Sequence, residues 1–494
     1  MPDVISRKLD RLTQGERPRV LDLFAGCGGL SLGFHRAGFV IGAAVELDPL
    51  AAASHAQNFH RDIEPEAFVR AARARDITVT EPDELTDELG LGPCDTAFDV
   101  LVGGPPCQAY ARVGRAKLRE VAEHPEAFKV DPRANLYLRY IDYVRRTKPL
   151  AILMENVPDI LNFGGHNVVQ EIAETLSGLG YEARYTLINS AFHGVPQFRD
   201  RVFLLAYHRR LGQRVRFPKP THWADLPSGY AGTRAVAFKL IDMFSADAFV
   251  PEDVGTPDLP QAVSASEAIG DLPPITLHLE GKLRRGARRF TELQPYSDAS
   301  DLSPYARSMR SWPGFESIEG VYDHVIRCLP RDTMIFRAMK HGDEYPAAHA
   351  TAVRLFEAEV ERRRRRGELL SARGLDELKR RMVPPYPVGT FPNRWWKLRP
   401  DQPSRTLMAH IGKDTYSHIH YDSDQGRTIS VREAARLQSF PDGFVFCGTM
   451  NPAFRQIGNA VPPLMANRLA SVILRTLKAA IRRNVAEQMK VAAE

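Results

Sequence analysis

The sequence is poor in cysteine and has no long apolar run, and both shortages exclude classes of protein. No stretch approaches the roughly 20 apolar residues that a membrane-spanning helix needs. Residues 1–15 carry charges with no apolar segment behind them, so we expect no secretory signal. The scattered cysteines argue against a disulfide framework or a zinc site and fit a reducing compartment. We therefore expect a cytoplasmic protein without a metal. The five cysteines are Cys27, Cys94, Cys107, Cys328 and Cys447.

The charge balance is mildly positive. The chain has 66 Lys and Arg against 60 Asp and Glu, a formal net charge of +6. This excess is compatible with a polyanionic partner but does not establish one. Hydrophobic residues make up 44% of the chain and charged residues 26%, as in ordinary globular proteins. A length of 494 residues is enough for two or three domains.

A glycine-rich turn follows the first apolar strand. Val20–Phe24 has the composition of a strand, and residues 25–31 lead from it into a helix that reaches about Ala37. Glycines let the backbone approach a ligand, whose polar groups can meet the free amides at the start of the helix. Many nucleotide-binding folds have such a turn. This one departs from the dinucleotide fingerprint, whose third glycine would fall at Ser31, and this disfavours an NAD-dependent enzyme.

Two acidic residues follow at predicted strand ends. The strand Val40–Val45 ends in Glu46, from where a carboxylate can accept hydrogen bonds from ribose hydroxyls. The alternative for Glu46 is a solvated charge. Asp76 follows a polar helical segment, where a third strand would end. Its carboxylate could bind the exocyclic amine of an adenine, and the alternative is an ordinary turn residue.

Cys107 follows a buried strand and two prolines. The apolar run Phe98–Val102 predicts the strand, and Gly103-Gly104-Pro105-Pro106 stops it because proline fixes φ and lacks an amide hydrogen. The cysteine therefore lies on a stiff loop at a strand end, where ligands bind in open α/β sheets. A buried structural cysteine is the alternative, since free cysteines are among the most buried residues.

Glu155 ends another buried strand. The apolar run Leu150–Met154 continues directly into Glu155-Asn156-Val157-Pro158. We expect Glu155 to lie in the same layer as Cys107, so that both reach one bound base. A helix-capping or solvated glutamate is the alternative.

Two arginines alternate with other residues before a last apolar strand, Val202–Ala206. On an extended segment Gln197, Arg199 and Arg201 point the same way, so both guanidinium groups share one face. Such a face suits a base carbonyl and phosphates. Taken alone, however, an Arg-x-Arg pair is usually a solvated surface.

Six segments in this order resemble the motifs of the DNA cytosine-5 methyltransferases of bacterial restriction-modification systems. The segments are Asp22–Gly29, Gly103–Gln108, Glu155–Val157, Gln197–Arg201, Arg432–Asp442 and Gln456–Pro463. The resemblance implies a transferase that uses S-adenosylmethionine to methylate carbon-5 of cytosine. One departure is Arg75, where a glycine is frequent, and it weakens the adenine assignment for Asp76.

The resemblance also implies a role for individual residues. The catalytic residues would be Cys107, Glu155, Arg199 and Arg201. The substrate would be bound by Gln108, Asn156 and Gln197. The cofactor would be bound by Phe24, Ala25, Gly26, Gly28, Glu46, Asp76, Ile77, Pro105, Leu136, Asn459 and Val461.

The implied fold is α/β, with a Rossmann-like S-adenosylmethionine-dependent domain and a second, smaller, irregular target-recognition domain. We expect the first at residues 1–217, the second at 218–450, and a return to the catalytic domain at 451–494. Cations and aromatic residues at 282–289 and 393–397 support DNA contact in the second domain. The run Arg362–Arg366, flanked by glutamates, is typical of a solvated helix rather than a base reader.

The predicted substrate is cytosine in a specific duplex DNA sequence, flipped out of the helix so that Cys107 can bond to carbon-6. We expect residues 109–131 to close over the DNA, and the protein to be a monomer. The sequence leaves open whether a cognate restriction endonuclease is a further partner. Two alternatives stay open. An RNA methyltransferase of the same family would have a shorter recognition segment, and a catalytically silent DNA-binding scaffold would not need Cys107, Glu155 and Arg201.

Overall fold

The computed structural model describes residues 3–106, 135–243, 247–282, 292–296, 302–390, 392–412 and 416–491. The chain divides into two compact units. The first comprises Met1–Ala262, Val445–Cys447 and Ala460–Glu494, and the second comprises Val263–Phe444 and Gly448–Asn459. The first division falls after residue 262 rather than after 217. The reason is that residues 248–250 pair with a strand of the first unit, with Tyr185 N donating to Ala248 O at 2.9 Å and Val250 N to Tyr185 O at 2.8 Å.

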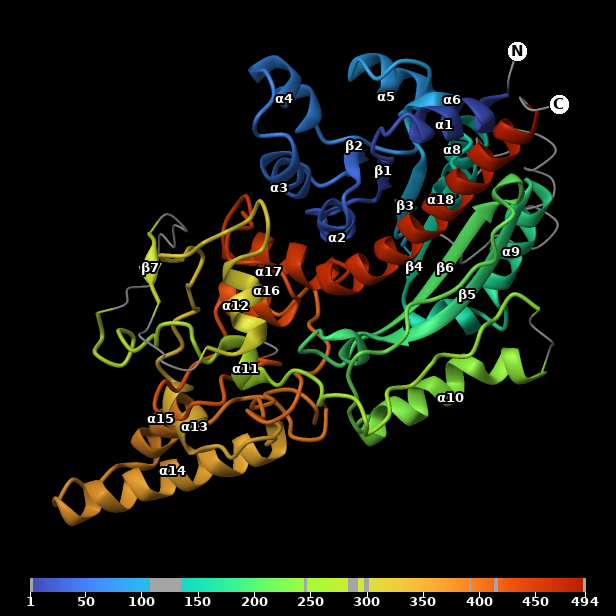
Figure 1. The fold of residues 1–494 in the computed structure, drawn as a ribbon. Helices are drawn as coiled ribbons and strands as arrows, with labels where there is room; N and C mark the ends of the chain where they lie inside the picture. Colours follow the sequence, from blue (N-terminus) through green and yellow to red (C-terminus); the bar gives the residue numbers. More distant parts are fainter. Residues whose placement is uncertain are drawn as a thin grey trace. The chain divides into compact units, whose positions relative to one another are not determined.

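A mostly parallel sheet forms the centre of the first unit (Figure 1). Its order in the described part of the chain is β2-β1-β3-β4-β6-β5, and β6 alone runs antiparallel to its neighbours β4 and β5. This architecture confirms the α/β prediction. The carboxyl ends of β1, β3 and β4 meet at one edge, where ligands bind in open sheets. The strands are β1 (Arg19–Leu23), β2 (Val40–Val45), β3 (Val100–Gly103), β4 (Ala151–Asn156), β5 (Tyr181–Asn189) and β6 (Asp200–His208).

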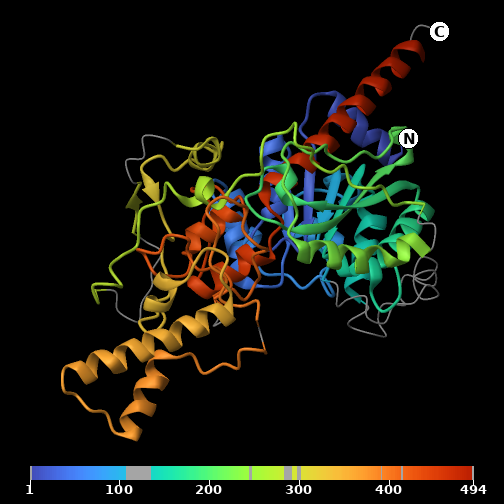
Figure 2. The same ribbon diagram turned by 90° about the horizontal axis from the view of Figure 1, so that it is seen from below.

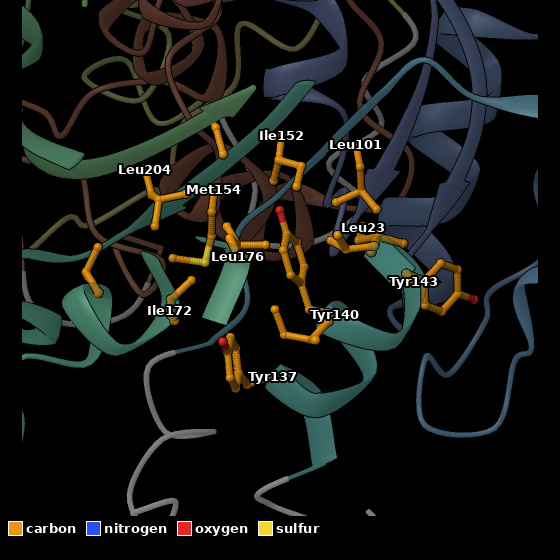
Figure 3. Packing of buried hydrophobic residues seen from close by; sticks show 14 of the residues in the cluster. Leu23, Leu101, Tyr137, Tyr140, Tyr143, Ile152, Met154, Ile172, Leu176 and Leu204 are labelled. Carbon is orange, nitrogen blue, oxygen red and sulfur yellow. The ribbon is translucent and has the colours of Figure 1, made fainter. Parts of the chain in front are cut away.

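Helices cover both faces of this sheet because successive strand residues point to opposite sides. Leu101 of β3 packs in a cluster with α8 (Asn135–Thr147) and α9 (Val168–Gly178). Figure 3 shows this cluster, in which Tyr140 lies among strand side chains that include Leu23 and Ile152. The neighbours of Leu101, Val100 and Val102, pack in a second cluster. That cluster includes residues of α1 (Val4–Thr13), α2 (Gly29–Ala37) and α18 (Pro463–Val491).

The segment between β2 and β3 is helical in the structure and contains no further strand. The predicted third strand before Asp76 is therefore wrong. Asp76 begins a turn, in which its carbonyl accepts from Val79 N at 3.2 Å and from Thr80 N at 2.9 Å. The helices here are α3 (Pro49–Phe59), α4 (Pro65–Ala71), α5 (Pro82–Glu88) and α6 (Cys94–Ala97). The other described helices of the unit are η3 (Pro158–Asn162), η4 (Ser190–His193), η5 (Arg209–Leu211) and α10 (Ser228–Met243).

The second unit consists of helices, two short strands and long irregular segments (Figure 2). Buried ion pairs hold it together. The fully buried Arg436 contacts Asp442 at 2.6 Å and Asp271 at 3.0 Å, and Arg427 contacts Glu433 at 2.7 Å. Removing one partner of such a pair leaves an uncompensated buried charge, which is strongly destabilising. The elements are α11 (Ala265–Ile269), β7 (Gln294–Pro295), α12 (Pro304–Arg310), β8 (Gly320–Val321), α13 (Thr333–Ala338), α14 (Tyr345–Arg365), α15 (Ala372–Met382), α16 (Val431–Leu437) and α17 (Met450–Asn459).

Among the residues that the structure describes, no helix is both long and apolar enough to cross a lipid bilayer.

Candidate active site

The glycine turn after β1 has an unusual backbone. Phe24 has φ 57° and Gly28 has φ 102°, values in the left-handed region that side chains with a Cβ rarely adopt. For an aromatic residue this conformation costs on the order of 1 kcal/mol and is found mainly where function or packing requires it. The next residue, Gly29, begins α2, and a Cβ there would lie 2.3 Å from the carbonyl oxygen of Val461. The turn therefore depends on glycine for its conformation and for this close approach.

Glu46 fixes the turn from the neighbouring strand β2. Its Oε2 accepts from Gly26 N at 2.8 Å, and its Oε1 accepts from Asp48 N at 2.7 Å. The half-buried side chain is therefore not the solvated charge of the alternative interpretation. Each carboxylate oxygen keeps a second lone pair with which it can accept from a ligand hydroxyl.

Asp76 follows a residue that is bonded to the backbone of Glu46. The backbone amide of the preceding Arg75 donates to Glu46 O at 2.7 Å. Asp76 Oδ1 accepts from Thr78 N at 2.9 Å and from Thr78 Oγ1 at 2.7 Å. Asp76 is thus an ordinary turn residue, as the alternative interpretation had it. The turn also brings it near the end of β2. The following Ile77 is buried in the cluster that includes α8.

A buried chain of hydrogen bonds underlies the glycine turn. Ser31 Oγ donates to Asp22 Oδ2 at 2.6 Å and lies 3.0 Å from His55 Nε2. All three side chains are at most 1% exposed. Burial raises the pKa of Asp22 to about 7 and holds the pKa of His55 well below its usual value. This cluster links β1, α2 and α3, and sequence reasoning missed it. The available signal was Ser31 itself, a polar residue at the glycine position of the dinucleotide fingerprint.

Glu155 is paired with Arg201 at the end of β4. Arg201 Nε lies 2.8 Å from Glu155 Oε1, and both side chains are 13% exposed. Arg201 Nη1 also donates to Asp200 O at 2.7 Å. The two predicted catalytic residues are therefore in direct contact, and neither is the solvated surface charge of the alternative interpretations.

The loop after β3 reaches this ion pair. A Cβ on Gly104 would lie 2.9 Å from Glu155 Oε2, and Asn156 Nδ2 donates to Pro105 O at 2.7 Å. Asn156 thus holds the loop in place, a role that was not predicted. Sequence reasoning also missed Gly104 as a contact of Glu155, although the Gly-Gly-Pro-Pro sequence marks a tightly packed loop. Cys107, Gln108 and the predicted closing loop 109–131 lie outside the described residues.

The remaining predicted residues have different surroundings. Arg199 is 1% exposed, and its Nη2 donates to Ala460 O at 3.2 Å. Burial, together with the charge of Arg201, lowers the pKa of Arg199. Gln197 is fully buried. Leu136 is partly buried against the α8 cluster, Val461 is 6% exposed, and Asn459 is exposed at the end of α17 in the second unit.

Comparison with known proteins agrees with the motifs. A protein of Oceanobacillus iheyensis named "Putative type II methyltransferase M.OihORF3336P" is 36% identical over 471 residues, which is 94% of this chain and 97% of that protein. The type II methyltransferase M.AgeI of Thalassovita gelatinovora is 30% identical over 470 residues, covering 92% of this chain and 99% of that protein.

A solved structure shares the fold. It is described as a "putative DNA modification methyltransferase encoded within prophage" from E. coli, and it superimposes with a TM-score of 0.58 at 20% identity, covering 93% of this chain and 99% of that one. The family model described as C-5 cytosine-specific DNA methylase matches residues 18–475. The chain therefore belongs to the C-5 cytosine-specific DNA methylase family.

Proposed function

We propose that the protein methylates carbon-5 of cytosine within a specific duplex DNA sequence, using S-adenosylmethionine and a covalent bond between Cys107 and the base. The observation that carries the proposal is the Glu155–Arg201 ion pair, which lies against Gly104. Cys107 follows Gly104 by only three positions in the sequence, and this short separation from a contact of Glu155 supports a shared role for the two side chains.

The residues of the glycine turn fit an adenosyl cofactor. A Cβ on Gly26 would meet no atom within 4 Å, so there is open space above the turn. Glu46 has lone pairs for ribose hydroxyls, and the exposed Leu47 beside it offers an apolar surface. We assign Phe24, Gly26 and Glu46 to the cofactor, with Asp76 and Val461 as neighbouring contacts. When bound, S-adenosylmethionine supplies an electrophilic methyl group.

Carbon-5 of cytosine is a poor nucleophile, and the chain's residues must activate it. The Cys107 thiolate adds to carbon-6, which splits one difficult step into easier ones. Glu155 donates a proton to ring N3 and accepts a hydrogen bond from the exocyclic amine, so that the negative charge is neutralised as the sulfur adds, and the proton returns to Glu155 when the ring is restored. After carbon-5 is methylated, it loses its proton to water, the bond between sulfur and carbon-6 breaks, and the aromatic ring is restored.

Arg201 has two functions in this proposal. Its Nε orients Glu155, and its Nη1 is bonded to Asp200 O. Among the described residues its Nη2 donates no hydrogen bond, and we assign this group to the base carbonyl. Arg199 is too buried to meet the base directly, so we assign it to positioning the segment around Ala460. The base must leave the duplex for these contacts, at a cost of a few kcal/mol.

The test is methyl transfer to DNA. Genomic DNA from a host that expresses the protein should carry 5-methylcytosine at one recurring sequence, and Cys107→Ala should abolish this while DNA binding is retained. Cys27→Ala is the matched control. Cys27 is 1% exposed and burial raises the pKa of its thiol, so it should have no chemical role. Retained turnover by Cys107→Ala, or methylation of tRNA instead of duplex DNA, would contradict the proposal.

A further inference from the structure

Helices α14 and α15 form a hairpin, residues 345–382, and most of its residues are not buried. The buried residues of α14 are Tyr345, Ala348, Thr351 and Ala352, all in its first half, and α15 buries only Leu378. Figures 1 and 2 both show α14 continuing well past this anchored start, with α15 beside it. A helix of 21 residues is about 30 Å long. Its outer half therefore presents side chains on nearly all sides to solvent.

The hairpin holds a large share of the chain's excess positive charge. Residues 345–382 contain ten Arg and Lys against six Asp and Glu, so this short segment carries +4 of the formal net charge of +6. It contains no Asn and no Gln, the side chains that bond adenine edges in DNA recognition. Arginine and lysine bond phosphate oxygens, so the composition suits contact with the DNA backbone.

Pairing within the hairpin occupies three of its six carboxylates. Glu359 pairs with Arg362 and with Arg363, the latter at 2.8 Å. Glu361 pairs with Arg365 at 3.0 Å, and the side chain of Glu377 pairs with Arg373 at 3.2 Å. Six exposed cations of the hairpin have no ion pair within the described residues. They are Arg354, Arg364, Arg366, Lys379, Arg380 and Arg381.

We propose that the α14–α15 hairpin binds the phosphate backbone of duplex DNA outside the target base pairs, without regard to sequence. The inference rests on the proposed function for its choice of DNA among polyanions. Arginine matches phosphate oxygens with paired donors, and the length of α14 is comparable to one turn of the duplex, about 34 Å. The solvated helix expected from the sequence is thus also a contact surface, which holds nearby DNA while the target is located.

The experiment compares two triple variants of the full-length protein. The test variant is Arg364→Gln, Arg380→Gln and Arg381→Gln. The control variant, with the same loss of charge, is Arg475→Gln, Lys478→Gln and Arg482→Gln, three exposed positions on α18. Equilibrium binding to a random-sequence DNA duplex is measured at 50–200 mM salt, with tRNA as a second ligand. Circular dichroism and thermal unfolding establish that both variants are folded.

The test variant should bind the random duplex at least about tenfold more weakly at low salt than the wild type, and the slope of log K against log salt should fall by up to about 3. The control should show neither change to this extent. Equal losses in both variants, or a loss confined to tRNA, would overturn the proposal. Because this readout needs no methyl transfer, failure of the hairpin proposal and failure of the proposed function can be told apart.

Discussion

Arg201 Nε lies 2.8 Å from Glu155 Oε1 and joins two segments that are far apart in the sequence. The contact is possible because β6 runs antiparallel to β4, with Glu155 opposite Phe203 and Asn156 opposite Val202. Arg201 therefore lies just beyond the paired end of β4, and its side chain extends back to the Glu155 carboxylate. A lysine in its place would offer a single point charge in place of the planar guanidinium donors.

Replacing Arg201 should impair methyl transfer far more than DNA binding. Arg201→Ala leaves a largely buried carboxylate without its partner, which costs on the order of 1–3 kcal/mol. We expect the single-turnover rate to fall by about 100-fold or more, which corresponds to about 2.7 kcal/mol, and Arg201→Lys to lie between alanine and the wild type. Arg209→Ala, at an exposed arginine bonded to Ser177, is the control. A rate within twofold of wild type for Arg201→Ala would show that the ion pair is not needed.

Gly104→Ala should displace Glu155 without unfolding the protein. The added Cβ would lie 2.9 Å from Glu155 Oε2, and the carboxylate, held by Arg201 on its other oxygen, would have to shift. We expect kcat to fall at least about tenfold, because small misplacements of a catalytic group are costly. Thermal unfolding should change little. Gly178→Ala, where a Cβ meets nothing within 4 Å, is the control, and an unchanged kcat for Gly104→Ala would contradict the assignment of Glu155.

The strand-end positions could be predicted from the sequence because they depend on local patterns. An apolar run that ends in a glycine or an acid fixes where a buried strand stops, and parallel strands bring their carboxyl ends together. This is why Glu46 and Glu155 lie at strand ends in the structure as the sequence indicated. The prediction that Gln197, Arg199 and Arg201 share one contact face was less reliable. Alternation along a strand does not tell that Arg199 is buried and that Arg201 is partly exposed.

The features that sequence reasoning missed depend on distant contacts. Ser31 binds Asp22 and His55 through the packing of three separate elements, and no local pattern encodes that meeting. The boundary between the first and second units lies beyond residue 217 because residues 248–250 pair with the edge of β5. The sequence of these residues has no regular strand pattern. Asp76 lies in a turn rather than at a strand end because its carboxylate bonds to Thr78 nearby.

Ser31→Ala should weaken both the fold and the cofactor turn. The change removes a hydroxyl that bonds the buried Asp22 and faces the buried His55, so both side chains lose a partner. We expect a loss of about 1–3 kcal/mol in the free energy of unfolding and a larger change in KM for S-adenosylmethionine than in kcat. Ser177→Ala, which removes an exposed hydrogen bond to Arg209, is the control. The coupling is measured with His55→Ala and with the double variant that carries both changes. If the double variant loses as much free energy of unfolding as the two single variants added together, the two residues are not coupled.

Asp22→Asn should change how stability depends on pH between about 4 and 7. Burial raises the pKa of Asp22 from its ordinary value of 3.8 to about 7, and the charge of Glu46 acts in the same direction, whereas the hydrogen bond from Ser31 opposes it. Burial holds the pKa of His55, which faces the same hydroxyl, well below its usual value of 6.5. In the unfolded chain Asp22 ionises near pH 4, but in the folded protein it keeps its proton until about pH 7. The stabilising effect of the raised pKa is thus complete below pH 4 and is lost as the pH rises to 7.

Relative to Asp22→Asn, which does not titrate, the wild type should lose up to about 4 kcal/mol in its free energy of unfolding over this window, at about 1.4 kcal/mol per pH unit. Denaturant unfolding of both proteins at pH 4, 5.5, 7 and 8 measures the difference. A constant difference across these values would mean that Asp22 titrates alike in the folded and unfolded chains, and that its burial beneath the cofactor turn does not control its protonation.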